Sequence, residues 1–410
     1  MERPTIDMGK VTDEVLAELN ALAEAAEYPS YPGLNKYSGL YQARIARGVH
    51  PDQQALDDAR EALALSWAID LGPCTNVELV GFRSEPLDVD RVTLWLLGRA
   101  KQAGARQALL DLSGFFRAET VPARHVICLW GPTPTSPVRI DVHTSLVPPA
   151  QLPASAQKDE VLARPHWDHI RPGSPFRPRT TAAIVRRLDL GVWFNRGTTM
   201  PQLNGSSRPA EVLLLPLFVR SHVAVTAEWT EIPLEVPLVG GLQQTMPACP
   251  DERCRVTPTP YEPDLSGLEA ACRNWMALPG DVHRAVTTAL TRLNEASALH
   301  ALDTAFIALA SALEQLLLEP DKDRNVGFKV ASRLARYLER DPDRRQQVFA
   351  TAHEFYSHLG PDMRGLRKTG HASETTQRLM SVLGDMHGHC RRLILQVIER
   401  GELPSRDDVG

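Results

Sequence analysis

The 410-residue sequence contains no apolar run long enough to cross a membrane. The longest run extends from Val212 to Val219 and is interrupted by Pro216, whereas a membrane-spanning helix needs about 20 apolar residues. Residues 1–4 do not open an apolar signal core of the kind that directs secretion. From these absences we expect a cytoplasmic protein that does not contact a membrane.

An excess of positive charge is also absent. The sequence has 45 lysines and arginines against 50 aspartates and glutamates, which gives a formal net charge of -5. Any contact with nucleic acid must therefore come from a local basic patch. The sequence also has no glycine-rich phosphate-binding loop and no G-x-S-x-G nucleophile motif.

Clusters of metal-binding residues are few. Of the six cysteines only Cys249 and Cys254 lie close together, and no second pair has matching spacing. Free cytosolic thiols are therefore favoured over the alternative of a zinc site. His166 and His169 have ligand spacing but no third ligand beside them. We expect no metal and no cofactor.

The first 262 residues predict a mixed domain. Residues 51–71 have a helical pattern, and three apolar runs are typical of strands, at Val77–Phe82, Val92–Leu97 and Val212–Val219. Alternating apolar and polar residues predict half-buried strands at 138–142 and 223–229, and a continuation at 232–236 after a bend. Residues 131–180 contain ten prolines, which favours an ordered excursion or a linker.

After an irregular stretch at 240–263 the pattern becomes helical. Apolar residues recur at helical spacing in four segments, at 282–293, 302–316, 330–338 and 379–397. The predicted class is α+β, in which a mixed region with an antiparallel sheet (1–262) precedes an all-α bundle (263–402) and a tail (403–410). His387 and His389 lie off the apolar stripe of the last helix, so we expect them to be exposed.

Three segments of the C-terminal part carry a resemblance to a known family. They are Ala308–Leu316, which contains an Ala-Leu-Glu sequence ending at Glu314, the arginine-bearing Phe328–Ala335, and Glu354–His371. Together they resemble the HEPN domains, and most closely the Apea-like branch. The resemblance covers about residues 264–402. It implies an all-α bundle that forms homodimers.

The resemblance also implies an active site. Active HEPN members are metal-independent ribonucleases with an Arg-x4–6-His motif, which Arg364 and His371 match here with six residues between them. Their chemistry suits the role. A neutral imidazole can take the proton of the RNA 2′-hydroxyl, and a guanidinium can hold two phosphate oxygens.

Other residues are predicted to assist Arg364 and His371. The predicted substrate-binding residues are all basic, and they are Arg333, Arg336, Arg340, His358, Arg367 and Lys368. Tyr356 and Glu314 are predicted supporting residues, with Glu314 paired either with a motif arginine or in a structural ion pair. A solvent-exposed helix face is the alternative interpretation of Arg333, Arg336 and Arg340.

Two functions remain open at this stage. The first is an endoribonuclease effector of a toxin or anti-phage defence type, with RNA as partner and an unknown trigger or ligand at the N-terminal region. The second is a degenerate HEPN protein that dimerises or binds RNA without cutting it. The interruption at Gly360-Pro361 and the glycine at position 365 favour the second. The same Arg-x4–6-His spacing also recurs at Arg44–His50 and Arg164–His169 without similar context.

Overall fold

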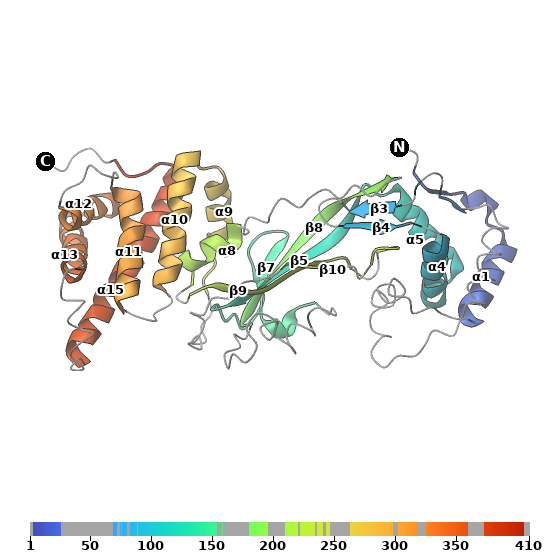
Figure 1. Ribbon diagram of the computed structural model, residues 1–410, viewed down its shortest axis with the longest axis horizontal. Helices are drawn as coiled ribbons and strands as arrows, with labels where there is room; N and C mark the ends of the chain where they lie inside the picture. The colour runs from blue at the N-terminus through green and yellow to red at the C-terminus, as the bar shows by residue number, and fades with distance from the viewer. Residues whose placement is uncertain are drawn as a thin grey trace.

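The protein is mixed α+β, with antiparallel sheets in its N-terminal half and helices in its C-terminal half. The computed structural model describes residues 3–25, 69–71, 74, 76–79, 83–87, 89–153, 158, 180–195, 210–219, 222–233, 236–240, 243–246, 263–297, 302–318, 325–359 and 373–405. Within these ranges three groups of elements follow one another along an elongated molecule (Figure 1). Helices lie at the N-terminal end, a sheet occupies the middle, and a bundle lies at the C-terminal end.

The N-terminal helices are α1 (Asp13–Ala25), α4 (Val89–Ala103) and α5 (Ala105–Arg117). Beside them, β1 (Thr5–Ile6) pairs with β2 (Ile69–Asp70). The predicted strand at Val92–Leu97 is wrong, because these residues lie inside α4. Val92, Trp95 and Leu96 are buried at helical spacing, and the apolar residues between them conceal that period in the sequence.

The main sheet is antiparallel throughout and has the order β10-β9-β5-β8-β3-β4, with β7 also paired to β8 and β6 paired to β7. Its strands are β3 (Asn76–Leu79), β4 (Arg83–Pro86), β5 (Thr120–Trp130), β6 (Val138–Arg139), β7 (Thr144–Val147), β8 (Ala182–Asn195), β9 (Ala224–Glu231) and β10 (Gln243–Met246). β5 and β8 are the longest strands. They run from the N-terminal helices toward the bundle (Figure 1).

Two large hydrophobic cores lie along these long strands, beside a smaller one that contains Val126 and Ala183. Val121 and Val192, at one end of the β5–β8 pair, share a core with α4 and α5. Ile127 and Ile184, near the other end, share a core with the helices of the bundle. One pair of strands therefore joins both cores.

Two further strand predictions are wrong. The strand expected at 138–142 ends with β6, because Asp141 Oδ1 accepts hydrogen bonds from the main-chain N–H groups of His143 (2.6 Å) and Thr144 (2.7 Å) and thereby forms a turn. In the continuation expected at 232–236, the described residues 232, 233 and 236 are not in a strand, because β9 ends at Glu231 and the chain turns over residues 236–240.

The run Val212–Val219 is helical and not a strand. It forms α8 (Ala210–Leu214) and the 3-10 turn η4 (Leu215–Leu217). Its apolar side chains are buried between the sheet and the bundle, so the continuous apolar run reflects burial on all sides. In the proline-rich stretch, η3 (Pro149–Gln151) is ordered. Most of residues 154–179 lie outside the described residues, and so do residues 51–68 of the helix predicted at 51–71. The end of that prediction is wrong, because Ile69 and Asp70 form β2.

The C-terminal bundle confirms the four predicted helices. They are α10 (Gly280–Ala296), α11 (Leu302–Leu317), α12 (Val326–Leu338) and α15 (Ser373–Arg400). Two more helices, α9 (Leu268–Met276) and α13 (Pro342–His358), were not predicted. Across the described ranges, no helix combines the length and hydropathy needed to cross a membrane.

The bundle is attached to the sheet by hydrogen bonds as well as by the shared core. The side-chain amide of Asn294 on α10 donates to the carbonyl of Val223 and accepts from its N–H, both at 2.8 Å. The ring of His222 contacts the carbonyl of Asn294 at 2.8 Å. Arg391 on α15 donates to the carbonyl of Val219. The core and these bonds therefore cross the expected boundary at residue 262.

Candidate functional site

The predicted catalytic residues Arg364 and His371 lie in segment 360–372, together with the predicted substrate-binding residues Arg367 and Lys368. This segment is outside the described residues. The structure does describe the helices on either side of it. α13 ends at His358 before the segment, and α15 begins at Ser373 after it.

An ion pair joins the two helices that flank this segment. Nε of Arg378, in the second turn of α15, lies 2.7 Å from Oε1 of Glu354, in the last turns of α13. The side chain of Arg378 is 71% exposed, so the pair stabilises the fold little in water. It nevertheless shows that the helix that precedes the segment lies next to the helix that follows it.

His358 belongs to the same cluster. Its Nε2 lies 3.8 Å from Oε1 of Glu354, one helical turn earlier on α13. This nitrogen is buried and has no hydrogen-bond partner among the described residues. Among the predicted substrate-binding residues that the structure describes, His358 is the nearest in sequence to segment 360–372.

The two supporting residues, Tyr356 and Glu314, contact each other. The hydroxyl of Tyr356 on α13 donates to Oε1 of Glu314 at 3.3 Å and to the carbonyl of Ala310 at 3.4 Å, both on α11. On α12, Gly327 approaches so closely that an added Cβ would lie 2.8 Å from Cβ of Tyr356. Tyr356 is therefore wedged between α11 and α12.

Burial determines the protonation of this pair. It raises the pKa of Glu314, while the hydrogen bond from Tyr356 acts in the opposite direction. The pKa of Tyr356 lies well above its ordinary value, first because of burial and then because of the neighbouring Glu314 carboxylate. Tyr356 thus remains a protonated hydrogen-bond donor at neutral pH. Among the described residues, the partner of Glu314 is this tyrosine and not an arginine.

The three predicted arginines do not form one exposed stripe on α12, because this helix ends at Leu338, before Arg340. Arg333 is buried, and its Nη1 donates to the carbonyl of Leu317 at 2.8 Å. It thereby satisfies one of the carbonyl groups left open at the end of α11. Arg333 therefore does not face solvent, contrary to the prediction. Arg336 and Arg340 are exposed.

The prediction that His387 and His389 are exposed is wrong. Nε2 of His387 lies 2.6 Å from Oγ of Ser297, at the end of α10. Burial, followed by the charge of Arg391, lowers the pKa of His387 to about 3. Burial and then Arg392 also lower the pKa of His389. His387 is therefore neutral at pH 7 and joins two helices.

The cysteines in the described ranges are free thiols. Burial is the main cause that raises the pKa of Cys128, Cys272 and Cys390 to about 12, which leaves them inert as nucleophiles. The described residues contain no group of three histidine, cysteine or acidic side chains arranged to hold a metal. Cys249, Cys254, His166 and His169 lie outside those ranges.

The chain matches no protein-family model, no curated protein and no solved structure. Its function must therefore be inferred from its own residues.

Proposed function

We propose that this chain is a metal-independent endoribonuclease with a HEPN-like, Apea-like C-terminal bundle. The observation that carries the proposal is the Glu354–Arg378 ion pair at 2.7 Å. It joins the two helices that precede and follow the segment containing Arg364 and His371. Both catalytic residues thus belong to a short connection whose two flanking helices are held side by side.

In the proposed reaction, His371 accepts the proton of an RNA 2′-hydroxyl. The 2′-oxygen attacks the adjacent phosphorus, the bond from phosphorus to the 5′-oxygen breaks, and the leaving oxygen takes up a proton. Arg364 holds the phosphate oxygens, on which negative charge accumulates. The products are a 2′,3′-cyclic phosphate and a 5′-hydroxyl. Arg336, Arg340, His358, Arg367 and Lys368 would bind the RNA around this site.

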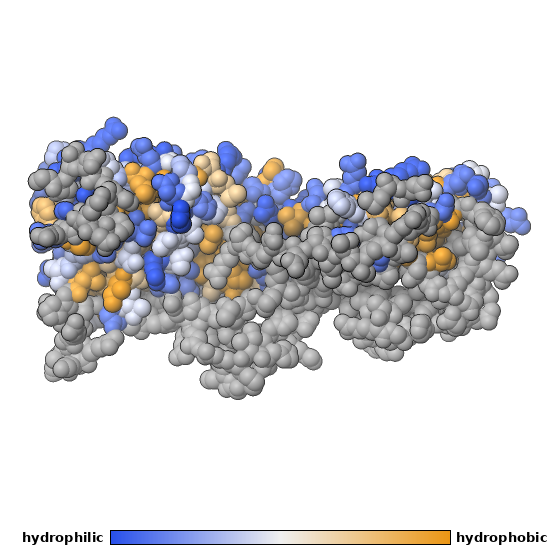
Figure 2. Space-filling model, turned by 45° about the horizontal axis from the view of Figure 1, so that its top comes forward, coloured by the Kyte–Doolittle hydropathy of each residue, from blue (hydrophilic) through white to orange (hydrophobic). Residues whose placement is uncertain are grey.

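A homodimer through the bundle would supply a second histidine, so that one acts as base and the other as acid. Three large apolar side chains on the bundle support this part of the proposal. Ile307 on α11, Phe328 on α12 and Met380 on α15 are 62%, 50% and 51% exposed. The face of the bundle visible in Figure 2 combines hydrophilic areas with smaller apolar ones, and a dimer would cover such apolar side chains.

The decisive experiment compares the wild-type protein with H371A, R364A and the control H353A. His353 is an exposed histidine on α13. Each protein is incubated with a labelled RNA in EDTA, and with the same strand in which a 2′-deoxynucleotide replaces the nucleotide at the cleavage site. We expect H371A and R364A to lose about 100-fold or more of the cleavage rate, H353A to retain it, and the deoxy strand to stay intact.

The same variants test the role as a toxin or anti-phage effector. Expression of the wild type should arrest growth, whereas H371A should not. Equal toxicity and equal RNA cleavage by wild type and H371A would overturn the proposal.

The interruption at Gly360-Pro361 and the glycine at position 365 favour the second function, a degenerate HEPN protein that dimerises or binds RNA without cutting. This alternative predicts RNA that stays intact in every state tested. It also predicts RNA binding that weakens steeply with salt, because phosphate contacts release counterions.

A further inference from the structure

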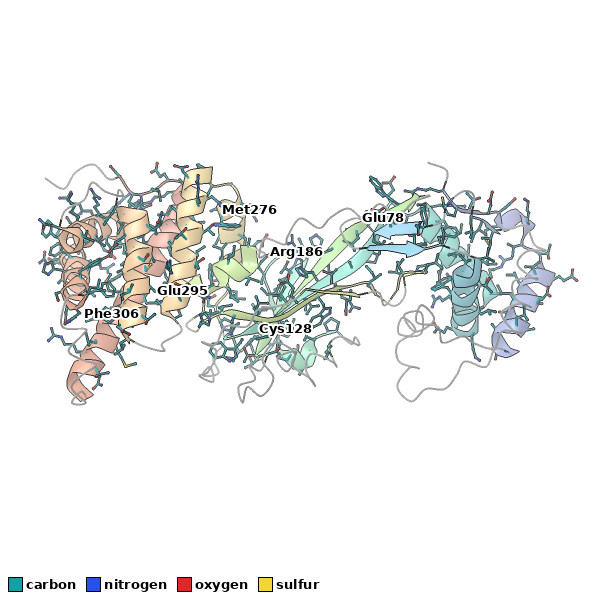
Figure 3. The ribbon with its side chains drawn as sticks, viewed as in Figure 1. Glu78, Cys128, Arg186, Met276, Glu295 and Phe306 are labelled. Atoms are coloured by element: carbon teal, nitrogen blue, oxygen red, sulfur yellow. The ribbon has the colours of Figure 1, made fainter. Side chains whose placement is uncertain are left out.

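A cavity of about 390 Å³ opens on the face of the sheet opposite the bundle. Ile184 and Leu146 point to the bundle core, so their strand neighbours Val185 and Ser145 point to the other face. Val185 and Ser145 both line the cavity. Figure 3 labels Arg186 on β8 and Cys128 on β5 in this central part of the sheet. The volume falls within the range of sites for small ligands.

Strand register brings two arginines to this cavity. Arg139 on β6 pairs with Ser145 on β7, which pairs with Val185 on β8. Arg187 lies two residues further along β8 and lines the same cavity. Strand spacing and rise place the two arginine Cα atoms roughly 12 Å apart. Two arginine side chains can span that distance from opposite sides and hold one anion between them.

These two guanidinium groups are not neutralised by the nearby carboxylate. Asp141 also lines the cavity, but its Oδ1 accepts the main-chain N–H groups of His143 and Thr144. Arg139 uses its Nε to donate to the carbonyl oxygen of Asp141 at 2.9 Å, which leaves four other N–H donors. No described residue forms an ion pair with Arg187.

The rest of the lining defines the shape of the ligand. Ser145, His143 and Gln151 add hydrogen-bonding groups, while Val142 and Val185 add apolar surface. The side chain of Val142 is 69% exposed, and a flat organic group in the cavity would cover it. Two arginines match the charge of a phosphate monoester, about -1.5 to -2 at pH 7, better than the single charge of a carboxylate.

We propose that this cavity binds a small phosphate monoester with a flat organic body, of nucleotide size. The phosphate lies between Arg139 and Arg187, and the flat group packs against Val142 and Val185. The site belongs to the N-terminal α+β part, where such a ligand would act as the signal that the protein senses. The binding proposal does not depend on RNA cleavage.

The test is calorimetric titration of the full chain with adenosine 5′-monophosphate, adenosine, inorganic phosphate and benzoate. An ionic strength of about 0.05 M keeps screening low. We expect the monophosphate to bind at least about tenfold more tightly than the other three compounds. R187Q and R139Q should each weaken it about 10- to 100-fold. R186Q is the matched control, because it removes the same charge from the next residue of β8, on the opposite face.

Several outcomes would overturn the proposal. One is equal binding of the monophosphate by wild type and R187Q, or an equal loss in R186Q. Another is binding of adenosine or benzoate as tight as that of the monophosphate. A third is binding of an RNA strand, dependent on Arg187, without binding of the monophosphate, which would make the cavity a backbone contact. Circular dichroism establishes that each variant is folded.

Discussion

At the scale of single residues, the contact between Glu314 and Tyr356 joins two helices of the bundle. The two side chains come from α11 and α13, 42 residues apart in sequence. The tyrosine stays protonated, and it donates to a carboxylate that burial makes harder to ionise. The pair therefore stabilises the helix packing next to the proposed site without taking part in proton transfer itself.

Glu314 should make the stability of the protein depend on pH. The pKa of Glu314 in the folded protein is raised above its ordinary value of 4.5. Protonated Glu314 therefore stabilises the fold fully below pH 4.5. This stabilisation is lost as the pH rises through the folded-state pKa. E314Q does not titrate and still accepts from Tyr356. We expect E314Q to be more stable than the wild type at pH 8, by less than about 1 kcal/mol, and the advantage to vanish near pH 4.5.

Thermal unfolding of both proteins between pH 4.5 and pH 8 measures this difference. E269Q is the control, because Glu269 is an exposed residue that pairs with Arg273 at 3.0 Å, and such pairs contribute little. A constant difference between E314Q and wild type across this range would show that Glu314 does not titrate as described.

The sequence did not predict that Tyr356 and Glu314 contact each other. Both were proposed as supporting residues from the resemblance, but a contact across 42 residues leaves no periodic signal in a single sequence. Arg333 was predicted to face solvent because it lies off the apolar stripe of α12. Its guanidinium instead donates to the carbonyl of Leu317. This contact depends on how α11 and α12 pack against each other, which the sequence does not show.

At the scale of elements, the long helices with a sustained apolar stripe were predicted, whereas α4, α8, α9 and α13 were not. α10 and α15 each bury one regular stripe, which the sequence displays. α4 and α8 are dense in apolar residues, so their helical period was hidden and they were predicted as strands. α13 buries only Val348, Ala352 and Phe355, too few for a clear stripe.

The packing of α12 against α13 can be tested at a glycine. Replacement of a helical glycine by alanine ordinarily stabilises a protein by up to about 1 kcal/mol. At Gly327 the new Cβ would lie 2.8 Å from Cβ of Tyr356, so one of the two helices must move. We expect G327A to lower the free energy of unfolding by about 1–3 kcal/mol, measured by urea denaturation.

The control for this experiment is G384A on α15. An added Cβ at Gly384 meets nothing within 4 Å, so this variant should gain stability. If G327A is as stable as G384A, the close approach of α12 to Tyr356 does not exist in solution.

At the scale of the whole molecule, the long strands β5 and β8 join the N-terminal helices to the bundle. Ile127 and Ile184 belong to the bundle core, whereas Val121 and Val192 belong to the core around α4 and α5. The composition shift near residue 262 separates the mixed part of the chain from the all-helical part, but it does not separate cores. β5 and β8 are paired along most of their length. They therefore connect the proposed ligand cavity to the bundle through continuous hydrogen-bonded structure.

The attachment of the bundle to the sheet should depend strongly on Asn294. Its amide satisfies both the N–H and the carbonyl of Val223, a buried residue. In N294A both groups lose their partner, which costs about 2 kcal/mol or more of the free energy of unfolding.

The control N274A changes an exposed residue of α9 and should alter stability by less than about 0.5 kcal/mol. Urea denaturation measures both effects, and hydrogen exchange at residues 222–231 should accelerate in N294A alone, because the start of β9 loses its attachment to α10. Equal stability and equal exchange in the two variants would mean that the shared hydrophobic core alone holds the sheet to the bundle.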